Sequence, residues 1–205
     1  MKKIIIVMTA VFGLLLSSMA FSAQDPNVAL RAALQKKDYR TAFQVSSKFA
    51  KQGDAAGQYV LGQLYLNGQG VKKHPGIAFS WFKKAADQHH PLARFALGSL
   101  YATGTGTRKN MQLARQQFNL AAQRGVPDAM RSLGIMYEKG DGVPKNIGAA
   151  MGWYEKAANK GMVDVQMMLA ERYLKGAGVK RNPGKAFAYA NKADRAAKKA
   201  KAKLV

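Results

Sequence analysis

The chain has 205 residues, of which 48% are hydrophobic and 21% are charged, a composition that supports a folded core and excludes an intrinsically disordered protein. Cysteine is absent, which excludes disulfide bonds, thiolate metal sites, a catalytic cysteine and a lipidated-cysteine anchor. Lys and Arg number 33 against 11 Asp and Glu, so the formal net charge of +22 favours acidic or polyanionic partners.

Residues 1–22 have the layout of a cleavable bacterial secretory signal peptide. Two lysines precede an apolar run, 4–16, and small residues follow it. The small residues permit cleavage after Ala20 or after Ser22. An uncleaved membrane anchor is the alternative, but a spanning helix takes about 20 apolar residues, more than this run supplies. We therefore expect a periplasmic protein, with secretion as the alternative, and no transmembrane segment in the mature chain.

A 36-residue period organises residues 55–194, and residues 38–53 match the second half of a repeat in phase. The recurring positions are a leucine, a tyrosine and a pair of glycines: Leu61, Leu97, Leu133, Leu169; Tyr65, Tyr101, Tyr137, Tyr173; Gly68/Gly70, Gly104/Gly106, Gly140/Gly142, Gly176/Gly178. A period of this length is typical of stacked helical hairpins. Each repeat predicts two helices joined by a glycine turn. Residues 23–54 lack the glycine turn and predict N-terminal capping helices, and 195–205 predict a basic C-terminal tail.

Repeat three carries the fullest motif: Ala129, Leu133-Gly134, Tyr137, Gly140, Gly142-Val143, Ala150, Trp153-Tyr154, Lys156-Ala157-Ala158 and Gly161. This pattern resembles the Sel-one-like repeat (SLR) family, a relative of the tetratricopeptide repeat. The resemblance implies an all-α fold: a right-handed α–α superhelix (solenoid) of four 36-residue helix–turn–helix repeats plus a degenerate N-terminal capping repeat. It also implies a role in protein–protein interaction, often in bacterial envelopes, without one defined activity.

Within the repeats we expect Trp153 to be a buried wedge between helices and Gly134 to mark a close helix contact. Asp54, Asp128 and Asp164 fall near the starts of first helices, which predicts helix caps.

No group of residues predicts chemistry. The glycine pairs follow a helix and not a strand, so they predict turns and not a nucleotide loop. His89 and His90 are adjacent, which on a helix directs them apart, and we expect them at a helix end. The late methionines favour core packing or an adaptable binding surface over a copper site. The sequence therefore predicts no catalytic, cofactor-binding or metal residues, and a protein that is not an enzyme.

Two surfaces are candidates for binding. The first is a groove on the side of the first helices that faces away from their leucines: Tyr59, Gln63, Leu66, Phe95, Ser99, Arg131, Ile135, Met167 and Glu171. Apolar residues on a face expected to be solvated indicate an interface. The second is a basic edge formed by the turns: Lys72, Lys73, Arg108, Lys109, Lys145, Lys180 and Arg181. Its alternative interpretation is solubility.

The sequence therefore predicts a periplasmic adaptor that binds another envelope protein, one with an acidic surface, through the groove and the basic edge. Roles known for similar proteins include accessory parts of envelope secretion systems or flagellar motors, and immunity to toxins. The alternative is a polyanion-binding protein, with lipopolysaccharide, a wall polymer or DNA as ligand. Against it, the basic edge lacks interleaved aromatic residues that would stack on bases.

Overall fold

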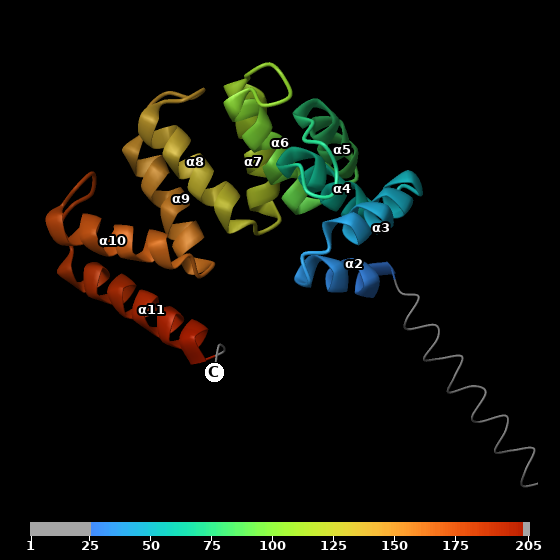
Figure 1. Ribbon diagram of the computed structural model, residues 1–205. Helices are drawn as coiled ribbons and strands as arrows, with labels where there is room; N and C mark the ends of the chain where they lie inside the picture. The colour runs from blue at the N-terminus through green and yellow to red at the C-terminus, as the bar shows by residue number, and fades with distance from the viewer. Residues whose placement is uncertain (1–25, 203–205) are drawn as a thin grey trace, which may run out of the picture. The chain divides into compact units, whose positions relative to one another are not determined.

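The computed structural model describes residues 26–202, so the predicted signal peptide, 1–22, lies outside the described residues. Over 26–202 the chain forms α-helices and turns and no strand, which confirms the predicted all-α class (Figure 1). None of the helices in this range is both long enough and apolar enough to cross a membrane. The helices are α2 (Pro26–Gln35), α3 (Tyr39–Lys51), α4 (Ala55–Asn67), α5 (Pro75–Asp87), α6 (Pro91–Thr103), α7 (Met111–Gln123), α8 (Pro127–Lys139), α9 (Ile147–Asn159), α10 (Val163–Lys175) and α11 (Pro183–Ala202).

The chain divides into two compact units, with the boundary between Ala85 and Ala86 near the end of α5. In the second unit α6 packs on α7, α8 on α9 and α10 on α11 (Figure 1). α7 also contacts α8, and α9 contacts α10, so successive hairpins stack in chain order. In the first unit α3 contacts both α2 and α4. Helix α11 continues to Ala202, so the first part of the 195–205 segment is helical.

Each first helix ends in the same glycine turn. In repeat three Gly140 has a φ of 83°, and its N–H donates to the Met136 carbonyl. The turn closes where the Asn146 N–H donates to the Tyr137 carbonyl at 2.8 Å, and the same bond recurs at 2.8 Å in the other three repeats. The Asn146 side chain then caps α9 by accepting from the Ala149 N–H at 2.9 Å. The glycine pairs are therefore structural turns, as predicted.

Inside each of the first three hairpins, an aromatic ring of the second helix lies on a glycine of the first. Tyr154 of α9 is 2% exposed, and a Cβ added to Gly134 of α8 would lie 2.5 Å from its Cε1 atom. Only glycine lets the ring approach the α8 backbone this closely. The same contact joins Gly98 to Phe118 and Gly62 to Phe82, with Cβ distances of 2.8 Å.

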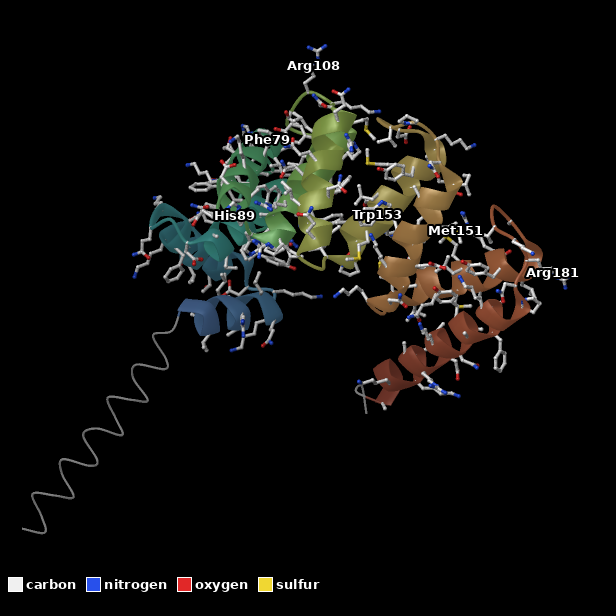
Figure 2. The ribbon with its side chains drawn as sticks, turned by 180° about the vertical axis from the view of Figure 1, so that it is seen from behind. Phe79, His89, Arg108, Met151, Trp153 and Arg181 are labelled. Atoms are coloured by element: carbon white, nitrogen blue, oxygen red, sulfur yellow. The ribbon has the colours of Figure 1, made fainter. Side chains whose placement is uncertain are left out.

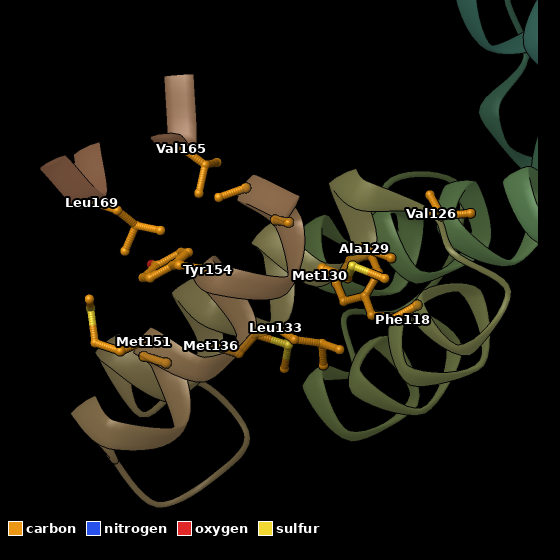
Figure 3. Close-up of a cluster of buried hydrophobic side chains, with 14 of the residues drawn as sticks. Phe118, Val126, Ala129, Met130, Leu133, Met136, Met151, Tyr154, Val165 and Leu169 are labelled. Carbon is orange, nitrogen blue, oxygen red and sulfur yellow. The ribbon is translucent and has the colours of Figure 1, made fainter. Parts of the chain in front are cut away.

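The core of the second unit runs through α7, α8, α9, α10 and the start of α11 (Figure 3). Ala157 and Ala158 are fully buried, which lets the helices approach closely. Met130, Met136 and Met151 are also buried in this cluster, where their flexible side chains fill space between helices. These three methionines are therefore core residues.

Trp153 is not the buried wedge that the sequence predicts. It is only partly buried at the edge of the cluster, with the Lys156 ammonium 4.0 Å from its ring centroid. The neighbouring Tyr154 fills the hairpin instead. Consecutive helical residues point about 100° apart, so of two adjacent aromatic residues one can lie in the core and the other at its edge. The sequence prediction chose the wrong one of the two.

Of the three aspartates that the sequence predicts to be helix caps, the structure confirms one. The Asp54 carboxylate accepts from the Gly57 N–H at 2.6 Å and caps α4. The prediction of caps at Asp128 and Asp164 is wrong, because α8 and α10 have Val126 and Met162 at the N-cap, with no side-chain hydrogen bond. Both carboxylates lie in the first helical turn, where they still complement the helix dipole.

Charged contacts join the third and fourth hairpins. Glu138 of α8 accepts from the Tyr154 hydroxyl at 2.7 Å and from the Arg172 guanidinium of α10 at 2.7 Å. Arg131 of α8 pairs with Asp164 of α10 at 2.8 Å. Burial raises the pKa of Tyr154, and its hydrogen bond to Glu138 raises it further. Burial alone would raise the pKa of Glu138, but the bonds from Tyr154 and Arg172 outweigh it and lower that pKa.

The close contact at Gly134 predicts that Gly134→Val destabilises the fold by about 1–3 kcal/mol, because the added carbons overlap the Tyr154 ring. Gly152→Ala in α9 is the matched control, since a Cβ there meets nothing within 4 Å. It should raise stability by up to about 1 kcal/mol through helix propensity. Thermal and urea unfolding measure both changes, and equal melting temperatures for the two variants would contradict the contact.

Tyr154 is more deeply buried than Trp153. We therefore predict that Tyr154→Ala lowers the free energy of unfolding by about 3–5 kcal/mol, as for other large buried side chains. Trp153→Ala should cost less, about 1–2 kcal/mol, because its ring already faces solvent on one side. Urea unfolding of the two variants gives the order. A larger loss for Trp153→Ala would show that Trp153 holds the hairpin after all.

The lowered pKa of Glu138 predicts a pH-dependent contribution to stability. The carboxylate stabilises the folded state above the pKa it has in the unfolded chain, about 4.3, and this contribution is lost as the pH falls through the lower folded pKa. Glu138→Gln should therefore be less stable than the parent at pH 7. The difference in the free energy of unfolding between the two should shrink below about pH 4. Urea unfolding at a series of pH values measures it; a difference independent of pH would indicate loss of packing only.

Candidate functional site

The predicted groove residues of the second unit lie on α6, α8 and α10, and they differ in exposure. Phe95 is partly buried, with its ring 5.7 Å from that of Phe118, so it packs within its own hairpin. The Ser99 hydroxyl donates to the Phe95 carbonyl at 3.0 Å. Ile135 is 37% exposed and Met167 is 61% exposed. The exposed apolar residues of this set therefore lie on α8 and α10.

The predicted groove residues of the first unit lie on α4. The Gln63 amide donates to the Tyr59 hydroxyl at 2.7 Å, and the Tyr59 ring lies 5.8 Å from that of Phe82. Burial raises the pKa of Tyr59, and the hydrogen bond from Gln63 offsets part of this. Tyr59 and Leu66 are half-buried while Gln63 is exposed. This face of α4 thus offers an amphipathic tyrosine held in place by packing.

An open hollow of about 310 Å³ lies where α6, α7 and α8 meet. It brings together two groove residues, Ser99 and Ile135, and one residue of the basic edge, Lys109. The rest of its lining comes from residues that the sequence did not single out: Ala102, Thr103, Met111, Phe118, Ser132, Met136 and Asp141. The hollow has an apolar floor with one cation and one carboxylate among its lining residues. We call it the α6–α8 hollow.

All seven residues of the basic edge are exposed and lie in the turns between the two helices of a repeat. Figure 2 shows Arg108 and Arg181 projecting outward from their turns in the second unit. Arg108 and Lys109 also line a second hollow of about 390 Å³ with Tyr101, Thr107, Asn110 and Leu113. Cations in such positions are available to a partner's carboxylates.

The remaining predicted groove residues are not in the α6–α8 hollow. Arg131 is engaged with Asp164 across the third and fourth hairpins. Met167 and Glu171 line two hollows formed by α10 and α11. The second unit therefore does not gather the predicted set at one place, but distributes it over separate hollows.

The sequence did not predict a row of buried polar side chains. Gln58, Arg94 and Gln166 each donate to a carbonyl at the end of the preceding second helix: those of Ala50, Ala86 and Ala158. The shared 36-residue offset between Gln58 and Arg94 was the available signal, but Met130 interrupts it in repeat three. These bonds satisfy helix-end carbonyls, which makes them structural.

The histidines also have structural roles. The His90 Nδ1 atom accepts from the Ala93 N–H at 3.2 Å and caps α6. His89 has a φ of 66° at a position where Gly53, Gly125 and Gly161 stand in the other hairpins. The residues between 26 and 202 contain no cluster of His, Asp and Glu that could hold a metal ion.

Comparison with known proteins identifies the repeat. A family model for the Sel1 repeat matches residues 55–90, 91–126, 127–162 and 163–193. These matches follow the 36-residue period and together cover more than half of the chain. A search of curated proteins found no match.

Solved structures share the same architecture. A Sel1 repeat protein from Oxalobacter formigenes is 33% identical, with a TM-score of 0.74 over 82% of this chain and 68% of that protein. A protective antigen of uropathogenic Escherichia coli strains, which displays an SLR fold, is 27% identical, with a TM-score of 0.76 over 87% of this chain and 39% of that protein. An immunity protein from Pseudomonas aeruginosa aligns over 83% of this chain and 65% of its own length. At 23% identity and a TM-score of 0.56, it shares the fold alone. With four matched repeats and a relative that is one-third identical, the chain belongs to the Sel1 repeat family.

Proposed function

We propose that this chain is a periplasmic adaptor that binds another envelope protein through its first helices and the basic edge of its turns. Sel1 repeat proteins are generally protein–protein interaction adaptors, and the family is typically non-enzymatic. The observation that carries the proposal is the α6–α8 hollow, in which Ser99 and Ile135 meet Lys109. An apolar floor beside a cation suits a partner that inserts an apolar side chain next to a carboxylate.

The predicted groove residues have different parts in this proposal. Ile135 is the exposed apolar contact, and Ser99 is a polar neighbour. Phe95 does not line the hollow, but it packs on Phe118, which does, and so helps to hold that part of the lining in place. On α4, Tyr59 and Gln63 offer a hydrogen-bonded pair that a partner can contact separately.

The periplasmic location rests on the predicted signal peptide, 1–22. It is tested by expressing the full chain in a Gram-negative host and measuring the mass of the exported form. Cleavage after Ala20 or Ser22 supports export. A chain that stays uncleaved in the cytoplasm would contradict it.

A polyanion ligand is the second candidate, favoured by the exposed turn cations and by the hollow that Arg108 and Lys109 line. The two candidates differ in their response to salt. A polyanion complex loses affinity by orders of magnitude between about 50 and 200 mM salt, because counterions are released on binding. A complex held in an apolar hollow loses far less.

We predict that Ile135→Asp weakens binding of the partner captured from envelope extract at least tenfold, since the carboxylate would enter the apolar floor. The variant should melt near the parent, because Ile135 is 37% exposed. A photoreactive residue at position 135 should cross-link to the partner. The same residue at Gly152, which is not in the lining of the hollow, is the matched control.

We further predict that Arg108→Glu combined with Lys109→Glu lowers the association rate several-fold and flattens its salt dependence, with little change in dissociation. Surface plasmon resonance at two salt concentrations measures both rates. If Ile135→Asp binds normally while the charge reversals abolish binding, the polyanion candidate replaces the adaptor.

A further inference from the structure

Helix α11 is longer than the other helices of the repeats. Each helix from α3 to α10 has 13 residues, whereas α11 has 20. The last seven residues of α11, 196–202, are all alanine or lysine. The additional turns therefore add positive charge to the chain without adding bulky apolar side chains.

Three cations of α11 form one stripe along the helix. Lys192, Arg195 and Lys199 are three and four residues apart, a spacing that places side chains on the same side of a helix. All three are exposed. At a rise of about 1.5 Å per residue, the stripe is about 10 Å long. The Lys192 ammonium donates to the side-chain oxygen of Asn159 of α9 at 3.0 Å, so the stripe borders α9. That bond is to a neutral amide and leaves the charge of Lys192 uncompensated.

Helix α9 adds a fourth cation beside the stripe. Lys156 is exposed and lies three residues before Asn159, so the two are neighbours on the surface of α9. The Lys156 ammonium lies 4.0 Å from the centroid of the Trp153 ring, a contact that orients the cation and keeps its charge. We call this set the α9–α11 basic face: Lys156, Lys192, Arg195 and Lys199.

The carboxylates of these two helices do not neutralise the α9–α11 basic face. Helices α9 and α11 contain one carboxylate each, and each is paired with a lysine outside the face. Glu155 of α9 pairs with Lys185 at 3.3 Å, and Asp194 of α11 pairs with Lys198 at 2.8 Å. The four cations therefore form a positive surface that attracts anions.

The side chains of this face favour a surface of phosphate groups over a protein or a nucleic acid. Three of the four are lysines, a residue that is depleted in protein–protein interfaces. The rings beside them are poorly placed to stack on bases, because Tyr189 is 8% exposed and Trp153 is partly buried with Lys156 over its ring. Lysine carries a compact charge on a flexible stem, which suits anions that move relative to one another.

We propose that the α9–α11 basic face binds the anionic headgroups of a phospholipid bilayer and lays α11 along the membrane surface. Binding is peripheral, because the face has no bulky apolar side chain to insert among the acyl chains. Each lysine or arginine near an anionic bilayer strengthens binding about fivefold. The face does not use the α6–α8 hollow, so this proposal is independent of the function proposed above.

The first test measures binding of residues 23–205 to vesicles of phosphatidylcholine, with and without phosphatidylglycerol. This chain contains α2 to α11 and omits the apolar run 4–16, which would itself enter lipid. We expect binding only to the vesicles with phosphatidylglycerol. It should weaken at least tenfold between about 0.01 and 0.15 M salt, because the Debye length falls from about 30 to about 8 Å. Equal binding to both kinds of vesicle, or binding that salt does not change, would overturn the proposal.

A matched pair of double variants tests the location of the site. Arg195→Gln with Lys199→Gln removes two cations from the α9–α11 basic face and should weaken vesicle binding at least tenfold. Lys180→Gln with Arg181→Gln removes the same charge from the basic edge and should weaken it no more than about threefold. Arg195→Lys with Lys199→Arg keeps the charge and should bind as the parent does. All these residues are exposed, so circular dichroism and the melting temperature should stay unchanged.

Three results of these comparisons would overturn the proposal. Equal losses in the two glutamine variants would show that net charge alone drives adsorption. A DNA duplex that binds more tightly than the vesicles, and loses affinity with Arg195→Gln and Lys199→Gln, would make the occupant a nucleic acid. Binding to lipopolysaccharide micelles without binding to phosphatidylglycerol vesicles would exclude the phospholipid bilayer.

Discussion

The contact between a glycine of one helix and an aromatic ring of the next sets the geometry of each of the first three hairpins. In repeat three the Tyr154 ring lies where a side chain on residue 134 would have to be, so α8 and α9 approach as closely as backbone and ring allow. A hairpin held at that distance has one fixed surface for its neighbour. The stacking of α8 on α7 and of α10 on α9 depends on that surface.

The joint between repeats three and four adds polar specificity to this packing. Tyr154 closes its own hairpin with its ring and holds Glu138 with its hydroxyl, and Glu138 in turn holds Arg172 of the next hairpin. One side chain thus links the packing inside a repeat to the register between repeats. Glu138 and Arg172 are only partly buried, but leaving either without its partner still costs free energy, so this arrangement favours one alignment of the two hairpins.

These constraints shape where a partner can bind. Side chains that pack, such as Phe95 against Phe118, are not free to anchor a ligand. Side chains that the stacking leaves exposed, such as Ile135, are free to contact a ligand. The turns, fixed by their glycines and by one repeated hydrogen bond, hold cations at the ends of the hairpins. Exposed apolar and basic residues on stacked hairpins suit the recognition of another protein.

The sequence by itself determined the repeat, its period, the glycine turns and the all-α class, because one 36-residue offset recurs at leucine, tyrosine and glycine positions alike. It could not decide between Trp153 and Tyr154, since adjacent aromatic residues fit the same periodicity and only the position of Gly134 on the facing helix selects one of them. Nor could it foresee that Arg131 would be engaged by Asp164, or that Ser99, Ile135 and Lys109 would share a hollow with Met111. Those outcomes depend on contacts between helices, and periodicity within one helix carries no information about which neighbour covers which face.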